Sequence, residues 1–312
     1  MKALIIGAAG FVGSYLIEHL KNDLKWDIAA TKMPMEQLCI PDISIYDLNI
    51  LDTETVLPLL QEVHPDAILH LAAQSSVGLS WKNPDLTIDV NIKGTIHVLD
   101  AIKELDYKPR VLLIGSGEEY GHILPNETPI KENTLTRPGN IYAATKACQN
   151  MLGKIYADAY QLDIMSVRAF NHIGPKQAPL FVVSDFCKQV ALIEAGRQEP
   201  IIRVGNLSAA RDFTDVRDVV RAYGLLIQKG HSGETYNVGS GNARPIEDIL
   251  QKILSCSSAA IKVEVDSAKL RPVDVPIIEA DITKLHNETG WLPSIPLDNT
   301  IKDVLDYWRA NI

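Results

Sequence analysis

The segment KALIIGAAGFVGSYL, residues 2–16, joins an apolar run to three glycines that recur every third residue. The run Ala3–Ile6 is typical of a buried parallel strand, and a helical pattern follows directly. Between them, Gly7 permits a tight turn, Gly10 lets the backbone approach a pyrophosphate, and Gly13 allows close helix packing. The free N–H groups at the helix start suit that pyrophosphate. The segment therefore predicts a dinucleotide site whose contacts include Gly7, Gly10, Phe11, Val12 and Gly13.

Four further apolar runs alternate with helix-length segments through the first half of the chain. The runs are Asp27–Ala30, Ala67–Leu71, Arg110–Gly115 and Asp163–Arg168. The helical segments are Phe11–Lys21, Thr53–Val63, Pro84–Leu105 and Asn140–Tyr160. This alternation predicts an α/β fold, a Rossmann-type doubly wound parallel sheet with strand order 3-2-1-4-5-6. Ligands are expected at the carboxyl ends of its strands.

After Arg168 the chain changes to loops rich in Pro, Gly and Asn, followed by shorter helices and strands. We expect residues 1–170 to form the dinucleotide-binding domain. Residues 171–312 are expected to form a smaller α/β domain that binds the substrate. This second domain is expected to be discontinuous, because residues 216–240 have the pattern of a helix and a strand that return to the first sheet.

The composition limits the classes of partner. The chain has 312 residues and a formal net charge of −9, from 30 Lys and Arg against 39 Asp and Glu. A nucleic-acid binder or a membrane-surface binder would show a basic excess, so neither partner is expected. No apolar run approaches the ~18 residues of a membrane span. The four cysteines lie far apart without a CxxC pair, so we expect a cytoplasmic protein with no disulfide framework and no metal site.

Three residues have the chemistry of a hydride-transfer site. Tyr142 and Lys146 lie four residues apart near the start of a predicted helix, so they share a face. Ser116 follows a predicted strand at its carboxyl end. An ammonium beside a phenol favours the phenolate and brings the tyrosine nearer to operating pH as an acid or base. A serine hydroxyl can donate to a carbonyl oxygen that gains charge. Lys146 could also hold the cofactor ribose.

The end of the second predicted strand bears on the choice of cofactor. An acid at this position usually binds the ribose 2′-hydroxyl of NAD. Here the strand runs into Thr31 and Lys32. A hydroxyl and a cation suit a 2′-phosphate better than a bare ribose, so the sequence favours NADPH over NADH. The alternative interpretation is a surface lysine that merely follows a strand.

Taken together, these motifs resemble the extended short-chain dehydrogenase/reductase family. The resemblance is carried by the glycine turn, by Ser116, by the Tyr142–Lys146 pair, by Asn91 and by His70–Ala73. Later blocks resemble the nucleotide-sugar branch, in particular GDP-mannose 4,6-dehydratases and their reductase relatives. These blocks are RAFNHIGP (Arg168–Pro175), VGNLSAARDF (Val204–Phe213) and LRPVDVP (Leu270–Pro276). The resemblance covers essentially the whole chain and is closest to GDP-6-deoxy-4-hexulose reductases, which make GDP-D-rhamnose.

The resemblance implies roles for further residues. Beside Tyr142 and Lys146, the cofactor would contact Asp47, Leu48, Leu71, Ala72, Ala73, Gln74, Asn91 and His172. The substrate, a GDP-sugar, would contact Ser116, Glu118, Tyr142, Asn171, Val204, Arg211, Arg271 and Asp274. Arginine suits the diphosphate because its planar fork makes paired bonds to phosphate oxygens. The resemblance also implies a homodimer formed through the segments Pro84–Leu105 and Asn140–Tyr160.

The residues after Ser116 favour one reaction over another. The resembling dehydratases place an acidic or hydroxyl side chain between this residue and a glutamate, whereas this chain has Gly117 and then Glu118. Elimination of water needs proton transfer at two places, while ketone reduction needs hydride, a polarised carbonyl and the tyrosine proton. We therefore expect NADPH-dependent reduction of the C4 ketone of GDP-4-keto-6-deoxy-D-mannose to GDP-D-rhamnose, in deoxysugar synthesis. Glu118 stays a candidate catalytic group.

Three alternatives stay open. A GDP-mannose 4,6-dehydratase is the first, because Glu118 is retained. A nucleotide-sugar 4-epimerase is the second, and a non-catalytic dinucleotide-binding protein is the third. The stereochemistry at C4 is also open, because residue spacing does not separate GDP-D-rhamnose from GDP-6-deoxy-D-talose.

Overall fold

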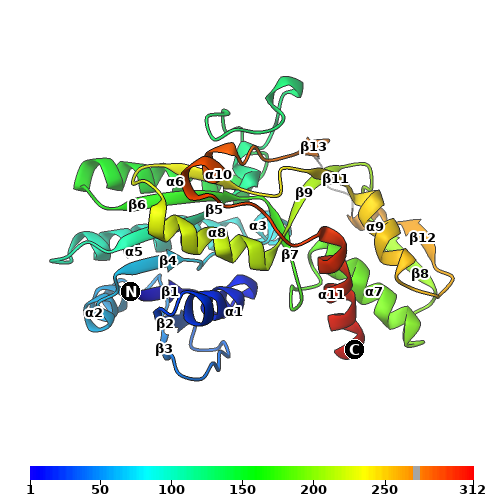
Figure 1. The fold of residues 1–312 in the computed structure, drawn as a ribbon, viewed down its shortest axis with the longest axis horizontal. Coiled ribbons are helices and arrows are strands. Elements are labelled where there is room, and N and C mark those ends of the chain that lie inside the picture. Colours follow the sequence, from blue (N-terminus) through cyan, green and yellow to red (C-terminus); the bar gives the residue numbers. More distant parts are fainter. Residues whose placement is uncertain (270–274) are drawn as a thin grey trace.

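A parallel sheet forms the centre of the molecule. The computed structural model describes residues 1–269 and 275–312, and within them the large sheet has seven strands in the order β10-β6-β5-β4-β1-β2-β3 (Figure 1). From β3 to β6 this is the expected order, and β10 extends the sheet beyond β6, which confirms the predicted fold class. The strands are β1 (Lys2–Ile6), β2 (Asp27–Lys32), β3 (Ser44–Asp47), β4 (Ala67–His70), β5 (Arg110–Ser116), β6 (Ile164–Ala169) and β10 (Thr235–Val238).

Helices cover both faces of this sheet. Side chains alternate along a strand, so Ala3 and Ile5 of β1 face one layer while Leu4 and Ile6 face the other. The first layer contains α1 (Phe11–Glu18) and α8 (Val216–Lys229). The second contains α2 (Thr53–Val63), α5 (Gly94–Lys103) and α6 (Ile141–Tyr160). Burial on both faces explains why β1 reads as a continuous apolar run.

The expected helix Pro84–Leu105 is not a continuous α-helix. After α3 (Val77–Lys82), the chain forms α4 (Pro84–Ile88), a π-helical turn (Asp89–Lys93) and then α5. A π turn inserts a residue and rotates the face that a helix presents. Here the turn contains Asn91, which is fully buried. The sequence pattern located this helical segment but did not reveal the turn, because the turn serves a contact with distant residues.

A smaller lobe lies at the right of Figure 1. Its helices α7 (Val182–Glu194), α9 (Ile246–Ser255) and α11 (Leu297–Ala310) pack together on an apolar core. Its strands are β7 (Asn171–Ile173), β8 (Ile201–Val204), β9 (Ala210–Asp215), β11 (Ala243–Pro245), β12 (Lys262–Val265) and β13 (Ile277–Ile278). Between β9 and β11 the chain leaves this lobe to form α8 and β10 of the large sheet. It returns to the large sheet again with α10 (Thr283–Thr289), which packs on β10.

The length and polarity of a helix decide whether it could cross a membrane. The longest of those named, α6, has 20 residues and contains several polar side chains. Over residues 1–269 and 275–312, no helix is both long and apolar enough to cross a membrane. The four cysteines are all unpaired thiols.

The glycine turn is packed too tightly for any side chain at two of its positions. Gly7 has φ +84°, and a Cβ there would lie 2.6 Å from the backbone of Ala72, which follows β4. A Cβ at Gly13 would lie 2.0 Å from the carbonyl oxygen of Ala8. These close approaches seat α1 directly on the end of β1, so its N-terminus points to the carboxyl ends of the strands.

We predict that Gly13→Ala lowers the free energy of unfolding by about 1–3 kcal/mol, because the backbone of the turn must move to admit the methyl group. Gly78→Ala is the matched control, since a Cβ there meets nothing closer than 3.8 Å. The control should change stability by less than about 1 kcal/mol, because alanine is the better helix former. Urea unfolding measures both variants, and equal losses would contradict the packing account.

Candidate active site

Ser116 ends β5 and begins a 3₁₀ turn over Gly117–Tyr120. Its hydroxyl oxygen accepts a hydrogen bond from the Glu118 N–H at 3.2 Å. Its own N–H donates to Glu119 Oε1 at 2.9 Å. Both interactions fix the serine in place, and its hydroxyl also forms a hydrogen bond with Tyr142.

Asn140 joins the catalytic helix to Glu118. Its side-chain oxygen caps α6 by accepting the Ala143 N–H at 2.8 Å. The amide nitrogen of the same side chain donates to Glu118 Oε2 at 3.1 Å. Because α6 also packs on β5 and the 3₁₀ turn, the structure brings Ser116, Glu118, Tyr142 and Lys146 to one place.

Tyr142 and Lys146 do not interact as the sequence analysis expected. Burial raises the pKa of the Tyr142 phenol, and a hydrogen bond with Ser116 only partly opposes this. The Lys146 ammonium is directed elsewhere, because it donates to the carbonyl of Ile114 at 2.7 Å and to Gln149 at 3.0 Å. The expected lowering of the tyrosine pKa by the lysine is therefore wrong for this structure. Tyr142 is a protonated phenol near neutral pH, the form that a proton donor needs.

Glu119 is a buried acid beneath the catalytic residues. Besides the Ser116 N–H, its carboxylate accepts from Arg168 Nε at 2.8 Å and from Asn150 at 3.3 Å. Burial raises its pKa to about 6, and Arg168 opposes that shift. The group links β5, β6 and α6. Sequence analysis missed Glu119; the available signal was a second acid directly after Glu118 at the end of a strand.

Burial also shifts the pKa of Lys146, in this case downward. Burial lowers the pKa of its ammonium to about 8, while the negative charge of Glu119 acts in the opposite direction. The lysine therefore depends on this acid to keep its charge as pH rises. A lysine that changes charge near neutral pH gives the site a titratable group other than the tyrosine.

Asn91 is fully buried, and its side chain forms hydrogen bonds with the backbone of Gln74. Its side chain accepts the Gln74 N–H at 2.8 Å and donates to the Gln74 carbonyl at 3.0 Å. It also donates to the Thr145 hydroxyl on α6 at 2.9 Å. These bonds hold the segment after β4 against the catalytic helix. Asn91 is thus a positioning residue for the segment that the sequence assigned to the cofactor.

The remaining cofactor candidates follow the ends of three strands. Gly10, Phe11 and Val12 follow β1, Leu48 follows β3, and Leu71, Ala72 and Ala73 follow β4. Carboxyl ends of parallel strands share one edge of the sheet, so these segments lie along a common edge. The close approach of Gly7 to Ala72 confirms that two of them are in contact.

An ion pair that the sequence did not reveal joins the ends of β2 and β3, where the cofactor adenosine is expected. Thr31 is buried, and its hydroxyl accepts the Gly7 N–H at 3.1 Å, so this side chain supports the glycine turn. Lys32 donates to Asp47 at 2.5 Å, across the ends of β2 and β3. A 2′-phosphate bound beside these strand ends would share the Lys32 ammonium with the Asp47 carboxylate.

His172 lies close to the start of α1. Its ring stacks on Phe11, with centroids 6.1 Å apart and an angle of 3° between the planes. The ring Nδ1 lies 3.0 Å from the Phe170 carbonyl, an arrangement in which Nδ1 carries the hydrogen and Nε2 is free. Burial lowers the pKa of this histidine, which favours the neutral ring.

Three further substrate candidates, Asn171, Val204 and Arg211, belong to the smaller lobe. Asn171 is exposed at the start of β7, which pairs with β9, and Val204 ends β8. Arg211 is buried in β9, where it donates to the carbonyls of Ala210 and Val275 at 2.8 and 2.7 Å. The two other candidates, Arg271 and Asp274, lie outside the described residues.

Comparison with known proteins places the chain in a family. Residues 4–304 match the model of the GDP-mannose 4,6 dehydratase family. The chain belongs to that family. It is 30% identical over 311 residues to the GDP-6-deoxy-D-mannose reductase of Pseudomonas aeruginosa, covering 100% of this chain and 98% of the relative.

Two solved structures have the same fold over the full chain. RMD from Pseudomonas aeruginosa complexed with NADPH has a TM-score of 0.89 at 29% identity, covering 100% of both chains. UDP-glucose 4-epimerase from Thermus thermophilus with NAD has a TM-score of 0.88 at 26% identity, again covering 100% of both. These likenesses confirm the predicted class, an NAD(P)-dependent oxidoreductase of the short-chain dehydrogenase/reductase type that acts on a nucleotide sugar.

We predict that kcat/KM falls as the pH rises through about 8, because Lys146 loses its charge there. Glu119→Gln removes the negative charge that favours the ammonium, so the fall should move to lower pH. Glu118→Gln is the matched control; it should lower the rate but leave the position of the fall unchanged. The measurement is a pH profile from about pH 6 to 10. A fall at the same pH in Glu119→Gln and the unchanged protein would contradict this role.

Proposed function

We propose that this protein reduces the C4 ketone of GDP-4-keto-6-deoxy-D-mannose to GDP-D-rhamnose, with NADPH as the reductant. One observation carries the preference for reduction over dehydration. A Cβ at Gly117 would lie 3.2 Å from the ring of Phe170, tighter than an ordinary contact. The position between Ser116 and Glu118 therefore has no side chain, and one placed there would require the Phe170 ring to shift by a few tenths of an ångström. Elimination of water would have to proceed without a proton-transferring group there.

The proposed cofactor rests on the glycine turn and on Lys32. The turn seats the N-terminus of α1 at the strand ends, where helix N–H groups suit a pyrophosphate. Lys32 ends β2 beside Asp47 and offers an ammonium to a 2′-phosphate. The Pseudomonas relative is described with NADPH bound. When bound, NADPH supplies a hydride to the substrate carbon.

Ser116 and Tyr142 would then stabilise and protonate the C4 carbonyl oxygen of the substrate. The Ser116 hydroxyl donates to the C4 carbonyl oxygen and stabilises the charge that develops on it. Tyr142 gives its phenolic proton to the same oxygen, so the ketone gains one hydride at carbon and one proton at oxygen. Lys146 uses two of its N–H groups on the Ile114 carbonyl and Gln149, and its remaining N–H would donate to the cofactor ribose. Burial of Tyr142 favours this direction, because the phenol starts protonated.

Binding of the GDP-sugar is proposed for the segments that resemble the family blocks. Arg211 would bind the diphosphate together with Asn171, and Val204 would border the nucleotide. Arg271 and Asp274 would complete the site. Glu118 is held by Asn140 at 3.1 Å, so its carboxylate is oriented to accept a hydrogen bond from a sugar hydroxyl.

Incubation with GDP-4-keto-6-deoxy-D-mannose should oxidise NADPH one for one and yield GDP-D-rhamnose by NMR, with NADH compared in parallel. Tyr142→Phe should lower kcat by about 10²–10⁴, because the proton donor is lost. Tyr160→Phe, at the exposed end of the same helix, is the matched control and should retain the rate.

Two results would overturn the proposed reaction. The absence of NADPH oxidation would exclude the reductase. Conversion of GDP-mannose to its 4-keto-6-deoxy form without net cofactor use would establish the dehydratase, the alternative that the retained Glu118 favours. Exchange of C4 epimers would instead identify an epimerase.

We further propose that the protein works as a homodimer in the cytoplasm. Several large apolar side chains are exposed on α3, α4 and α6, and these helices pack against one another. The exposed set is Leu79, Trp81, Leu86, Ile88, Met151, Ile155 and Tyr160. An exposed apolar surface on adjacent helices is typical of a protein–protein interface. The four free cysteines fit a reducing compartment.

We predict that the double variant Met151→Glu and Ile155→Glu is a monomer, because two buried charges oppose association. Leu135→Glu, an equally exposed apolar residue on a loop, is the control and should leave the dimer intact. Light scattering after size exclusion measures the mass. A dimer that survives the double substitution would place the interface elsewhere.

A further inference from the structure

Lys32 supplies the positive charge at the ends of β2 and β3. It lies directly opposite Asp47 in the parallel register of these strands. The carbonyl of Lys32 also accepts the Leu48 N–H at 2.8 Å, so the two strand ends are held together here. Residues 33–52, which include the β2–β3 connection, β3 and the segment before α2, contain no Lys or Arg. A 2′-phosphate bound beside this part of the chain would therefore depend on one ammonium.

That ammonium is already bound by other protein atoms. Lys32 Nζ donates to Asp47 Oδ1 at 2.5 Å and to the Met33 carbonyl at 3.4 Å. The lysine side chain is 17% exposed, so solvent screens the ion pair only in part. An ammonium has three N–H groups, which leaves one for a further acceptor. It also lacks the planar fork with which arginine binds two phosphate oxygens at once.

Thr31 contributes to the glycine turn rather than to this charge. The residue is buried, and its hydroxyl accepts the Gly7 N–H at 3.1 Å. Its carbonyl accepts the Ala8 N–H at 2.7 Å, on the same turn. The attraction for a 2′-phosphate at these strand ends therefore comes from Lys32.

Acidic side chains lie close to the ammonium. The Asp47 side chain is 57% exposed, and within residues 1–269 and 275–312 its second oxygen, Oδ2, has no hydrogen-bond partner. The Glu36 carboxylate accepts the N–H of Met33, the residue after Lys32, at 2.9 Å. A phosphate ester carries a charge of about −1.5 to −2 at neutral pH, so both acids oppose its approach. A bare 2′-hydroxyl has no charge and can donate to a carboxylate.

The Lys32–Asp47 ion pair therefore affects the two nicotinamide cofactors differently. With NADH, which has a bare 2′-hydroxyl, Lys32 can keep its full interaction with Asp47. With NADPH, the same ammonium must be shared between the carboxylate and the phosphate. Part of the ion-pair energy is then lost for the phosphate contact that is gained, so the net advantage of NADPH is small.

We propose that Asp47 sets the cofactor preference by holding Lys32, and that the protein binds NADH about as well as NADPH. Asp47 is a positioning residue in this role, since it acts on the 2′-phosphate through the lysine. The inference rests on the proposed function, because it concerns the same cofactor site.

The test is fluorescence titration of the full chain with NADPH and with NADH, in the absence of any sugar. The quantity measured is the Kd for NADH divided by the Kd for NADPH, in which contacts common to both cofactors cancel. This ratio should be below about ten in the unchanged protein. Asp47→Asn should raise it by about three- to tenfold, because the ammonium is freed for the phosphate. Lys32→Gln should lower it several-fold, because the attraction for the phosphate is lost.

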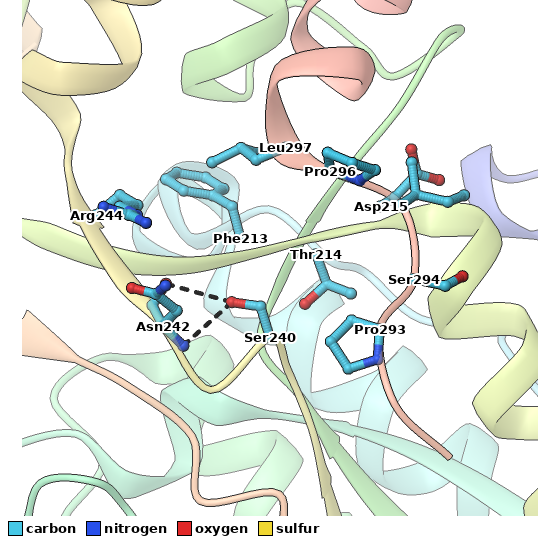
Figure 2. A pocket seen from close by; sticks show the side chains of 11 residues that line it. Phe213, Thr214, Asp215, Ser240, Asn242, Arg244, Pro293, Ser294, Pro296 and Leu297 are labelled. Atoms are coloured by element: carbon cyan, nitrogen blue, oxygen red, sulfur yellow. Dashed lines mark hydrogen bonds between the residues drawn. The ribbon is translucent and has the colours of Figure 1, made fainter.

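Arg244→Gln is the matched control. This arginine belongs to β11 of the smaller lobe, where it lines the pocket drawn in Figure 2, so a positive charge is removed away from β2 and β3. The control should have the ratio of the unchanged protein. A double variant tests how Asp47 acts. In the Lys32→Gln background, Asp47→Asn should change the ratio by less than it does when the lysine is present.

Three outcomes overturn the proposal. They are a ratio above about ten in the unchanged protein, an unchanged ratio in Asp47→Asn, and an equal effect of Asp47→Asn with and without the lysine. The last would mean that the carboxylate repels the phosphate directly. Circular dichroism confirms that each variant is folded. A protein that binds both cofactors but reduces no sugar would contradict only the proposed reaction, whereas one that binds neither cofactor would contradict both proposals.

Discussion

The buried carboxylate of Glu119 is the interaction on which the catalytic site depends. It accepts hydrogen bonds from the end of β5, from β6 and from α6, the elements that carry or adjoin Ser116, Tyr142 and Lys146. A fully buried acid is costly unless it is paired, and removal of one partner from such a pair typically costs about 3–5 kcal/mol. Arg168 and the backbone of Ser116 offset that cost. The stability of the core and the geometry of the site therefore rest on the same group.

Local spacing predicted most of the fold but only part of the site. The strand–turn–helix unit at Gly7–Gly13 follows from the steric needs of a tight turn, which are written in consecutive residues. The Glu119–Arg168 pair joins residues 49 apart and has no local signature. The π turn at Asp89–Lys93 contains Asn91, whose partner on α6, Thr145, is 54 residues away in the sequence. Such contacts between distant residues can be identified only from the folded structure.

The direction of the chemistry depends on burial more than on the expected lysine contact. The Tyr142 phenol is desolvated and stays protonated, whereas Lys146 donates to a β5 carbonyl and has a lowered pKa. A proton donor with these properties suits ketone reduction. The close approach of Phe170 to Gly117 is consistent with the same reaction. The net charge of −9 is compatible with the proposed anionic ligands, because a single local cation or helix N-terminus can bind a phosphate on an acidic protein.

Isotope transfer gives the decisive measurement. The protein is incubated with GDP-4-keto-6-deoxy-D-mannose and NADPH deuterated at the transferable position, and the sugar product is examined by NMR. The account predicts one deuterium at C4 of the product, since the hydride is delivered to the carbon whose oxygen faces Ser116 and Tyr142. A product that carries no deuterium, or carries it at C6, would contradict it.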